Sequence, residues 1–438
     1  MKDQESLVRQ IESIDFEELV SIQSNGAEPV GSLTDVKDPL TYKYSTLDTS
    51  ASTNILKISS QEAVQAGLEV LRRGKVGAVV VAGGLGTRLG FPSPKGMFPM
   101  GPVSGMSLFQ MHCEKIAALS KRYGYRIPYC MMTSHATHEQ TVLFLQQNNY
   151  FGLHKEDVFL FMQDSIPICS KETGKILLSE KGCMTKNPNG HGGMMDAISR
   201  KVGNHSVLDR LCDRGIEYLF YHQVDNPLTQ ICTPEFLGSH ILSGSEMTSQ
   251  VIRKQEPSER LGGMFAVGGR LHAIEYCNLP ATMAPHIWAG SIAVHLFNMN
   301  FLERMSQKKL PYHAVLRTHS FIDPVTEQKH CPSENNAIQY ERFILDMVLH
   351  AEQALVVEVP RQYHYAPLKN AHGLINTPAW CQKAMSDLHR HWLERAGLMV
   401  KPGMKVEIAP QFADSAETLM QNIRMRSAET VIPIVLQD

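Results

Sequence analysis

A run of glycines followed by two basic residues is the part of this sequence best suited to chemistry on phosphates. The run ends an apolar stretch as Val79-Val80-Val81-Ala82-Gly83-Gly84-Leu85-Gly86-Thr87-Arg88, and Pro94-Lys95 follow shortly after it. Glycines let the backbone approach a ligand closely, and a run of oriented amide groups binds anions. Arg88 and Lys95 add the positive charge that a polyphosphate requires. The pattern therefore predicts a phosphate-binding loop.

Two well-known glycine-rich loops do not match this run. A P-loop places its lysine directly after a glycine, whereas Lys95 follows Pro94. The dinucleotide fingerprint requires Gly-x-Gly-x-x-Gly, but the spacing from Gly84 is Gly-x-Gly-x-x-x-Gly. A plain turn after a strand is the structural alternative. The nearby Thr-Arg and Pro-Lys pairs favour a binding function, and the failed spacing argues against a dinucleotide-dependent dehydrogenase.

Asp225 is a second residue of interest, because it follows the strand predicted over Tyr218–Gln223. An aspartate after a strand is often only a turn or cap residue. Ligands of open α/β sheets, however, lie at the carboxyl ends of the strands, where the glycine run is also expected. The Val224-Asp225-Asn226 context and the nearby glycine run therefore favour a functional role for Asp225 over a turn or cap role.

The elements that must position these residues alternate between strands and helices. A continuous apolar, β-branched run such as Val76–Ala82 is typical of a strand buried on both faces of a parallel sheet. Helical periodicity separates several such runs, and the alternation predicts an open, mostly parallel α/β sheet. The further strands are predicted over Tyr129–Thr133, Val158–Met162, Tyr218–Gln223, Thr248–Ile252 and Val356–Val359, and the helices over Gln61–Arg73, Leu108–Tyr123 and Thr137–Asn149.

The chain is long enough for more than one structural unit. We expect an N-terminal unit over residues 1–70, with a helix over about 4–21 and an extended connector over about 23–60. Residues 71–375 would form the catalytic domain. Residues 376–438 would form a small C-terminal unit, with a helix through Trp392 and strands near Val406–Ile408 and Val431–Leu436.

Composition narrows the class of protein. The formal net charge of −2 offers no basic field for nucleic acid or an anionic membrane. The sequence contains no run of about 18 apolar residues, so no membrane-spanning helix is predicted. Its N-terminus does not resemble a signal peptide. The nine cysteines are scattered and odd in number, which favours reduced thiols over a disulfide framework. We therefore expect a cytoplasmic protein that is a monomer or a weak homo-oligomer.

Taken together, the motifs resemble those of the UDP-sugar pyrophosphorylases, and most closely the UDP-N-acetylglucosamine branch. The glycine run resembles the family pattern Ala-Gly-Gly-x-Gly-Thr-Arg-Leu-Gly…Pro-Lys-Gly-Met from Ala82 to Met97. The resemblance implies an open sheet of nucleotidyltransferase type, Rossmann-like and GT-A-like. Further matches follow in family order at Tyr150–Leu153, Gln163, Gly190–Gly193, Val224–Asn226, Glu275-Tyr276, Ala289-Gly290 and Pro367–Asn370.

The resemblance also implies roles for individual residues. Catalytic positive charges would come from Arg88, Lys95 and Lys369, and Asp225 would bind Mg²⁺. The residues implied in binding the uridine or the sugar are Gly83, Gly84, Gln163, Gly190, His191, Gly262, Glu275 and Ser291.

The implied reaction joins UTP to a hexose-1-phosphate, giving a UDP-sugar and pyrophosphate. A phosphate oxygen of the sugar-1-phosphate would attack the α-phosphorus in line. The nucleophile is already an anion, so charge neutralisation and positioning must carry the catalysis. A silent regulatory protein of the same fold is an alternative, but the retention of the charged residues argues against it.

Two positions depart from the acetylglucosamine branch. His191 stands where that branch usually has asparagine. The histidine resembles the Gly-His-Gly motif of the UDP-glucose pyrophosphorylases. Ser291 likewise stands where the acetylglucosamine branch has asparagine. A site built around one hydrogen bond can reject a substrate that lacks the matching group. N-acetylglucosamine-1-phosphate is thus the favoured acceptor, with UTP–glucose-1-phosphate uridylyltransferase or a broad-specificity UDP-sugar pyrophosphorylase as alternatives.

Overall fold

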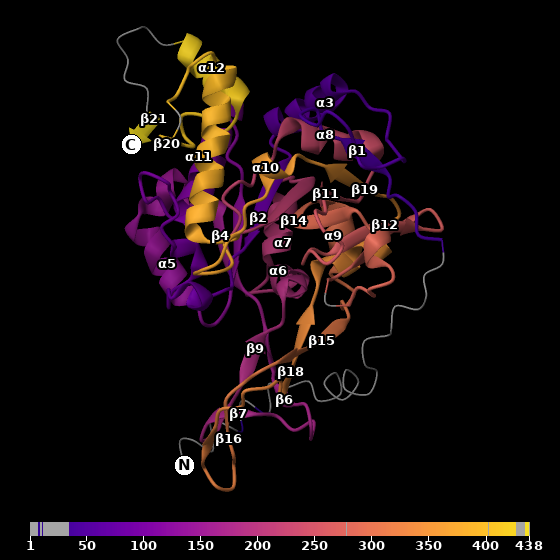
Figure 1. Cartoon of the computed structure of the whole chain (residues 1–438), viewed down its shortest axis with the longest axis vertical. Helices are drawn as coiled ribbons and strands as arrows, with labels where there is room; N and C mark the ends of the chain where they lie inside the picture. Colours follow the sequence, from indigo (N-terminus) through magenta and orange to yellow (C-terminus); the bar gives the residue numbers. More distant parts are fainter. Residues whose placement is uncertain are drawn as a thin grey trace.

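The protein consists of a broad α/β body from which a narrow β-arm projects (Figure 1). This computed structural model describes residues 35–276, 278–401, 403–425 and 434–437, together with Val8 and Ile11. Most of the helix predicted over residues 4–21 therefore lies outside the described residues.

The body is built on one large twisted sheet. Neighbouring strands on its main path are parallel except at β14, which runs antiparallel to both β10 and β11. The mixed α/β class with a mostly parallel sheet is confirmed. In order across the sheet, the strands are β1 (Thr41–Lys43), β19 (Ala354–Glu358), β11 (Met247–Arg253), β14 (Ala289–Asn298), β10 (Tyr218–Gln223), β2 (Val76–Val81), β3 (Tyr129–Thr133) and β4 (Val158–Met162).

Alternate side chains of each strand enter two separate cores, one on each face of the sheet. In β2, Val76, Ala78 and Val80 pack in one core, and Val79 packs in the other. This alternation follows from the two-residue period of a strand. The first core includes helices α3 (Ser60–Arg72), α4 (Leu108–Tyr123), α8 (Pro234–Ser243) and α11 (Pro378–Arg395), and the second includes α6 (Met194–Ser199), α7 (Val207–Asp213) and α9 (Met299–Met305). The short helix α5 (His138–Gln147) follows β3.

Helices α3 and α8 pack unusually close, because each presents a glycine to the other. A Cβ on Gly67 would lie 1.9 Å from the carbonyl oxygen of Pro234, and one on Gly238 would lie 1.6 Å from that of Ala63. A capping box between Ser59 and Glu62 fixes the start of α3. This helix therefore joins the body through its own backbone as well as its side chains.

The chain makes a long excursion between β11 and β14. It leaves β11, forms the antiparallel hairpin β12 (Gly263–Val267) and β13 (Arg270–Ile274), and returns to the sheet in β14. Arg253 and Ala289 face each other in the β11–β14 ladder, so the two ends of the excursion meet.

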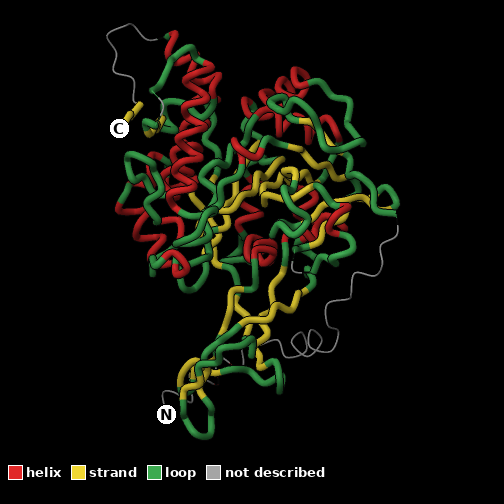
Figure 2. The backbone as a smooth tube through the Cα atoms, viewed as in Figure 1, coloured by secondary structure: helices red, strands yellow, loops and turns green. Residues whose placement is uncertain are grey.

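Short strands from two distant parts of the chain form the arm, seen below the body in Figures 1 and 2. They hydrogen-bond into small sheets with their own apolar contacts, such as those of Ile166, Cys169 and Tyr340. The arm strands are β5 (Ser165–Pro167), β6 (Cys169–Ser170), β7 (Leu178–Glu180), β8 (Cys183–Met184), β9 (Lys186–Pro188), β15 (Tyr312–Arg317), β16 (Phe321–Ile322), β17 (Lys329–His330) and β18 (Ala337–Arg342). The arm is absent from the elements predicted from the sequence; most of its strands have only two or three residues, and the two longer ones, β15 and β18, were also missed.

The two ends of the chain are bound to the body in different ways. The segment predicted as an extended connector contributes β1, which pairs in parallel with β19. At the other end, α11 stands against the body and is followed by β20 (Lys405–Ile408), α12 (Ala416–Arg424) and β21 (Ile434–Gln437) (Figure 1). Helix α12 was not predicted. The unit boundaries at residues 70/71 and 375/376 stay predictions.

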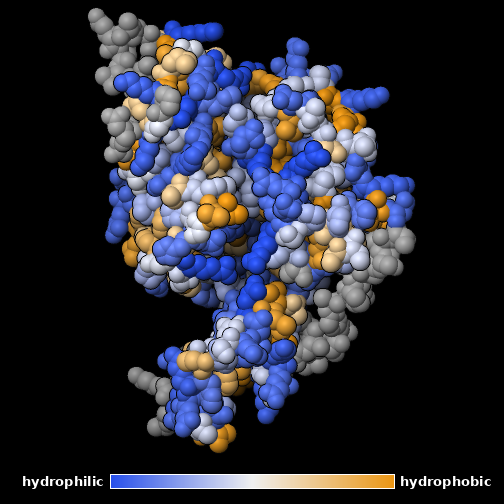
Figure 3. Space-filling view, viewed as in Figure 1, coloured by the Kyte–Doolittle hydropathy of each residue, from blue (hydrophilic) through white to orange (hydrophobic). Residues whose placement is uncertain are grey.

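The surface on the side shown in Figure 3 is mainly hydrophilic, with small scattered hydrophobic patches. One such patch lies at the tip of the arm, where the segment between β16 and β17 exposes Val325. Of the helices described, none combines the length and the apolar character that crossing a bilayer demands. None of the eight described cysteines is part of a disulfide bond.

Candidate active site

Four residues lie together at the carboxyl ends of neighbouring strands, and all except Ser134 were predicted from the sequence. Gly83 follows β2, Ser134 follows β3, Gln163 follows β4 and Asp225 follows β10. Strands β10, β2, β3 and β4 are consecutive and parallel, so their carboxyl ends share one edge of the sheet. This edge is where open α/β sheets bind ligands.

The glycine loop passes close to the side chain of Gln163 at Gly83. A Cβ at Gly83 would lie 2.1 Å from the Nε2 atom of Gln163. The Ser134 hydroxyl donates a hydrogen bond of 2.7 Å to the Gly83 carbonyl and holds the loop down. The Oε1 atom of Gln163 is buried and accepts no hydrogen bond from any described residue. Gly84 is exposed with open space beside it, so the loop presents free backbone next to an unsatisfied amide acceptor.

Three of the predicted residues form what we term the lysine cluster: Lys95, Asp225 and Lys369. The Oδ2 atom of Asp225 lies 3.2 Å from Nζ of Lys95 and 2.7 Å from Nζ of Lys369. Burial alone would raise the pKa of Asp225, but the charges of Lys369 and Lys95 outweigh it and lower the pKa to about 2. The cluster therefore carries two cations and one anion near neutral pH.

Asn226 explains how Lys369 reaches Asp225 from a distant part of the chain. Its side-chain amide donates to the His364 carbonyl at 2.7 Å and accepts from the Ala366 backbone N–H at 3.0 Å. The Leu368 N–H then donates to the backbone carbonyl of Asp225 at 2.8 Å. Because Asn226 is buried, these bonds tie the segment before Lys369 to the loop after β10. Asn226 was noticed only as part of a motif, and its positioning contacts were not predicted.

Arg88 lies outside the lysine cluster. Its residue is exposed at the end of the glycine loop, and it makes no ion pair with any described carboxylate. Its charge is one of several influences that lower the pKa of Glu341, a pKa that burial raises. The structure thus brings Lys95 and Lys369 together but leaves Arg88 at the rim, towards the arm.

Gly190 and His191 lie at the base of the arm, where β9 leads into α6. Gly190 has φ +85°, and a Cβ there would lie 2.5 Å from the Arg342 carbonyl oxygen, so only glycine fits. The Nδ1 atom of His191 accepts the Ile344 N–H at 3.2 Å, which assigns the ring proton to Nε2. Burial, helped by the charges of Lys369 and His313, lowers the pKa of His191 to about 4. His191 is consequently a neutral hydrogen-bond donor.

A second group of predicted residues surrounds Glu275, and we term it the glutamate cluster: His191, Gly262, Glu275 and Ser291. The Nε2 proton of His191 is directed towards Glu275. Its Nε2 atom lies 3.8 Å from Oε1 of Glu275, too far for a direct hydrogen bond. A Cβ on Gly262 would lie 3.6 Å from either carboxylate oxygen of Glu275. The Ser291 N–H donates to the Gly262 carbonyl at 2.8 Å. These contacts bring the four residues together around the carboxyl group of Glu275.

Glu275 has the most perturbed carboxyl group of the site. Burial raises the pKa of Glu275 to about 7, and the negative charges of Asp346 and Glu341 push it in the same direction. The charges of His313 and Lys369 oppose this rise. His313 bonds to Asp346 at 2.8 Å and stacks on Phe343, so this group of side chains frames the glutamate cluster. None of these framing residues was predicted from the sequence.

The described residues of the site supply too few donor atoms to bind a metal ion without additional atoms from a ligand. The described residues contain no group of three or more histidine, cysteine, aspartate or glutamate side chains arranged to bind a metal ion. The Oδ1 atom of Asp225 accepts no hydrogen bond from the described residues, since both lysines bind Oδ2. Mg²⁺ commonly binds one or two carboxylates together with substrate phosphates, and Asp225 fits that requirement.

Known proteins resemble this chain along most of its length. The family model described as UTP–glucose-1-phosphate uridylyltransferase matches residues 37–417. The UDP-N-acetylglucosamine pyrophosphorylase of Saccharomyces cerevisiae is 31% identical, with 96% of this chain and 92% of that protein covered. The UDP-N-acetylglucosamine diphosphorylase 2 of Arabidopsis thaliana is also 31% identical, with coverage of 82% and 75%.

Solved structures share the fold. The uridine diphosphate N-acetylglucosamine pyrophosphorylase from Trypanosoma brucei has a TM-score of 0.80 at 24% identity, covering 97% of this chain and 90% of that one. A UDP-glucose pyrophosphorylase from Leishmania major has a TM-score of 0.64 at 16% identity, with coverage of 89% and 80%. The sheet edge with its lysine cluster and the family match agree, and this chain belongs to the UTP–glucose-1-phosphate uridylyltransferase family.

Proposed function

We propose that this protein transfers a uridylyl group from UTP to a hexose-1-phosphate, with N-acetylglucosamine-1-phosphate as the favoured acceptor. The single observation that carries the proposal is the convergence of Lys95 and Lys369 on Asp225 beside the glycine loop. The relatives named as UDP-N-acetylglucosamine pyrophosphorylases, which align over most of the chain, support the choice of acceptor.

The lysine cluster suits a reaction between two anions. The sugar-1-phosphate needs no base, because its attacking oxygen is already ionised. The barrier is electrostatic, and fixed positive charge near the α-phosphorus lowers it without reorganisation during the reaction. In the free protein Asp225 keeps Lys95 and Lys369 in place through its ion pairs. The phosphates of a bound substrate would then also pair with the two lysines. Arg88, at the rim, would meet the outer phosphates of UTP.

The glycine loop and Gln163 would bind the uridine. The unsatisfied Oε1 of Gln163 can accept a hydrogen bond, and the imide N–H of uracil is a donor. Gly83 and Gly84 would let the base and ribose lie against backbone. Gly190, at the mouth of the arm, would complete this binding surface.

The glutamate cluster would bind the sugar. His191 offers an N–H, and Glu275 offers carboxyl oxygens across the gap of 3.8 Å, so a hydroxyl between them could bond to both. Ser291 and Gly262 would form the wall of this space. Lys369 influences the pKa of both Glu275 and Asp225, which is the placement required of a residue between the sugar and the α-phosphate.

We include Mg²⁺ in the proposal, with Asp225 as its protein ligand. Bound there, the ion would neutralise charge on the phosphate oxygens. The chain itself supplies the orientation, since the Asn226 bonds fix Asp225 relative to Lys369. The balanced charge and scattered cysteines further support a cytoplasmic enzyme with no nucleic-acid partner, acting as a monomer or weak homo-oligomer.

A substrate panel tests the function. UTP is supplied with N-acetylglucosamine-1-phosphate, glucose-1-phosphate or galactose-1-phosphate, and pyrophosphate release is followed. We expect the acetylglucosamine substrate to give the highest kcat/KM. A higher value with glucose-1-phosphate would support the alternative acceptor that the histidine at position 191 suggests. Absence of pyrophosphate release with every sugar would contradict the proposed reaction.

A further inference from the structure

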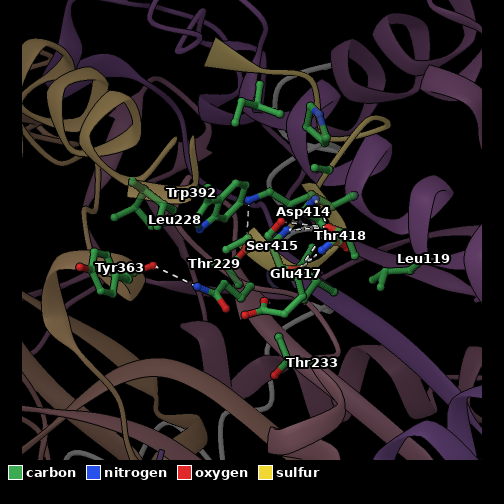
Figure 4. Close-up of a pocket in the computed structure, with 18 of the residues that line it drawn as sticks. Leu119, Leu228, Thr229, Thr233, Tyr363, Trp392, Asp414, Ser415, Glu417 and Thr418 are labelled. Atoms are coloured by element: carbon green, nitrogen blue, oxygen red, sulfur yellow. Dashed lines mark hydrogen bonds between the residues drawn. The ribbon is translucent and has the colours of Figure 1, made fainter. Parts of the chain in front are cut away.

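A cavity separate from both clusters lies between the body and the C-terminal helices. Its volume is about 660 Å³, within the usual range of small-molecule sites. It lies between the helices α3, α4 and α8 of the body and the C-terminal helices α11 and α12. Neither the lysine cluster nor the glutamate cluster contributes a residue to its lining. Figure 4 shows Leu119, Leu228 and Trp392 around it, with Asp414, Ser415 and Thr418 beside them.

Two helices each present a stripe of apolar and basic side chains to this cavity. Helix α3 contributes Val64, Leu68 and Arg72, four residues apart, and these positions share one helix face. Helix α4 contributes a second stripe at similar spacing. Its members are Met111, Lys115, Leu119 and Arg122. The cavity wall is therefore apolar with basic groups set into it.

The carboxylates that line the cavity are already satisfied by protein donors. Asp414 makes a two-pronged pair with Arg122, at 2.6 and 3.1 Å. Glu235 accepts from Tyr42 and Ser45, with bonds of 2.6 to 2.9 Å. The other two are also engaged. Glu407 accepts from Val103 and Ser104, and Glu417 pairs with Arg395.

Two of the basic groups have no such partner. Lys115 donates only to the backbone carbonyls of Pro227, at 2.7 Å, and Thr229, at 3.0 Å. Among the described residues, no carboxylate lies within ion-pairing distance of Lys115 or Arg72. Burial lowers the pKa of Lys115 to about 8, and the charge of Asp414 opposes this decrease. Arg72 is exposed to solvent, whereas Lys115 has one donor left that an anionic group in the cavity could use.

We propose that this cavity is a binding site for a small amphipathic anion, whose acidic head pairs with Lys115 and whose apolar body packs between α3, α4 and α11. The aliphatic wall of Leu119, Leu228 and Leu388 and the ring of Trp392 would hold the body. The third N–H of Lys115 remains available for the head.

The floor of the cavity connects it to catalysis. Residues 227–231 line it, and they directly follow Asp225 and Asn226. Tyr363 and His364 also line it, and they lead to Lys369 through the bonds that Asn226 makes. An anion that draws on Lys115 would change how this lysine braces Pro227 and Thr229. Binding in the cavity is therefore coupled to the lysine cluster, and linkage makes the coupling reciprocal.

Binding of two carboxylates, 2-naphthoate and decanoate, tests the site by calorimetry on the full chain. Their uncharged amides and inorganic phosphate serve as comparison probes. We expect at least one carboxylate to bind tenfold more tightly than its amide and than phosphate. The aromatic and aliphatic arms identify the body that the cavity prefers. Failure of both carboxylates to bind, or equal binding of the amide or of phosphate alone, would overturn the proposal.

Two matched variants locate the binding. Val64→Trp fills the cavity from α3, whereas Gln65→Trp places the same side chain on the exposed face of that helix. We expect Val64→Trp to weaken carboxylate binding at least tenfold and Gln65→Trp to leave it unchanged. In Lys115→Met, the preference for carboxylate over amide should disappear. Equal carboxylate binding in Val64→Trp and wild type would exclude the cavity.

The coupling is tested separately and rests on the proposed function. UTP affinity is measured with and without a saturating carboxylate. We expect at least a threefold change in the wild type and none in Val64→Trp. An unchanged affinity in the wild type would overturn the coupling. Failure to bind UTP even without the carboxylate would contradict the proposed function instead, so the two failures are distinguishable.

Discussion

The lysine cluster and the glutamate cluster shift the pKa of their carboxyl groups in opposite directions. In the lysine cluster, opposite charges meet, and the pKa of Asp225 falls to about 2. In the glutamate cluster, like charges gather around a buried carboxyl group, and the pKa of Glu275 rises to about 7. The first cluster is charged over the whole physiological pH range, whereas the second changes its protonation within that range.

This difference separates the two tasks of a transferase. A permanent set of charges suits the phosphates, which are the same for every acceptor sugar. A neutral donor such as His191 and a protonatable acid such as Glu275 suit hydroxyl or amide groups, which differ between sugars. We therefore expect changes in the lysine cluster to affect turnover with every acceptor, and changes in the glutamate cluster to affect the choice among acceptors.

Removal of one permanent charge should have the largest effect. Lys95→Ala is expected to lower kcat roughly 100-fold with every sugar-1-phosphate, as for the loss of one preorganised charge. Steady-state pyrophosphate release measures it. Lys383→Ala, which removes an exposed lysine paired with Asp387 on α11, is the matched control. Turnover near the wild-type value in Lys95→Ala would remove this lysine from the mechanism.

Loss of the acidic member of the lysine cluster should have a smaller effect. Asp225→Asn keeps the shape but leaves Lys95 and Lys369 without their carboxylate. We expect the Mg²⁺ concentration for half-maximal activity to rise roughly tenfold, because a neutral amide oxygen binds Mg²⁺ less well. Titration of Mg²⁺ against activity measures this, with Asp387→Asn as control. An unchanged titration curve would show that Asp225 does not bind the ion.

Replacement of His191 and Ser291, the two residues that differ from the acetylglucosamine branch, should alter the preference between acceptor sugars and leave the rate of uridylyl transfer largely unchanged. In the double variant His191→Asn, Ser291→Asn, we expect the ratio of kcat/KM for N-acetylglucosamine-1-phosphate over glucose-1-phosphate to rise about tenfold. The best kcat should change much less. Competition between the two sugars in one reaction gives the ratio directly. A fall in kcat for both sugars with no change in their ratio would break the division of tasks between the clusters.

The smallest expected effect concerns stability. The pKa of Glu275 is raised from 4.5 to about 7 in the folded protein, so the folded state binds more protons than the unfolded state between these values. The free energy of unfolding should therefore decrease from about pH 4.5 to about pH 7 through this group. Glu275→Gln should remove that contribution, seen as a flatter plot of Tm against pH. The exposed substitution Glu69→Gln is the control, and parallel plots for both variants would contradict the raised pKa.

The sequence predicted the lysine cluster better than its surroundings, and the reason is physical. Lys95 and Asp225 follow strands with long apolar runs, so periodicity placed them at one sheet edge. Lys369 came only from the family resemblance, because β19 is three positions away from β10 in the sheet and Asn226 bridges the distance. No periodicity reports such a side-chain bridge.

The glutamate cluster shows where sequence reasoning stops. Gly262, Glu275 and Ser291 were named through resemblance, but their framing by His313, Phe343 and Asp346 was not foreseen. These residues lie on β15 and in and just before the 3-10 helix Ile344–His350, and they meet Glu275 only through the tertiary fold, which no local pattern reports. Likewise, the fold class, β3, β4, β10 and α4 matched their predicted bounds, whereas the arm, α12 and the pairing of β1 were missed.

The excursion between β11 and β14 gives the molecule a replaceable part. Because Arg253 and Ala289 are paired neighbours, the whole stretch from 254 to 288 starts and finishes at nearly one point of the sheet. It carries Gly262 and Glu275, and Ser291 lies just past its end. A gene fragment covering 254–291 could thus be exchanged between relatives without moving any strand that holds the lysine cluster. Inheritance of this one contiguous segment would therefore replace three of the four residues of the glutamate cluster at once, with His191 as the exception.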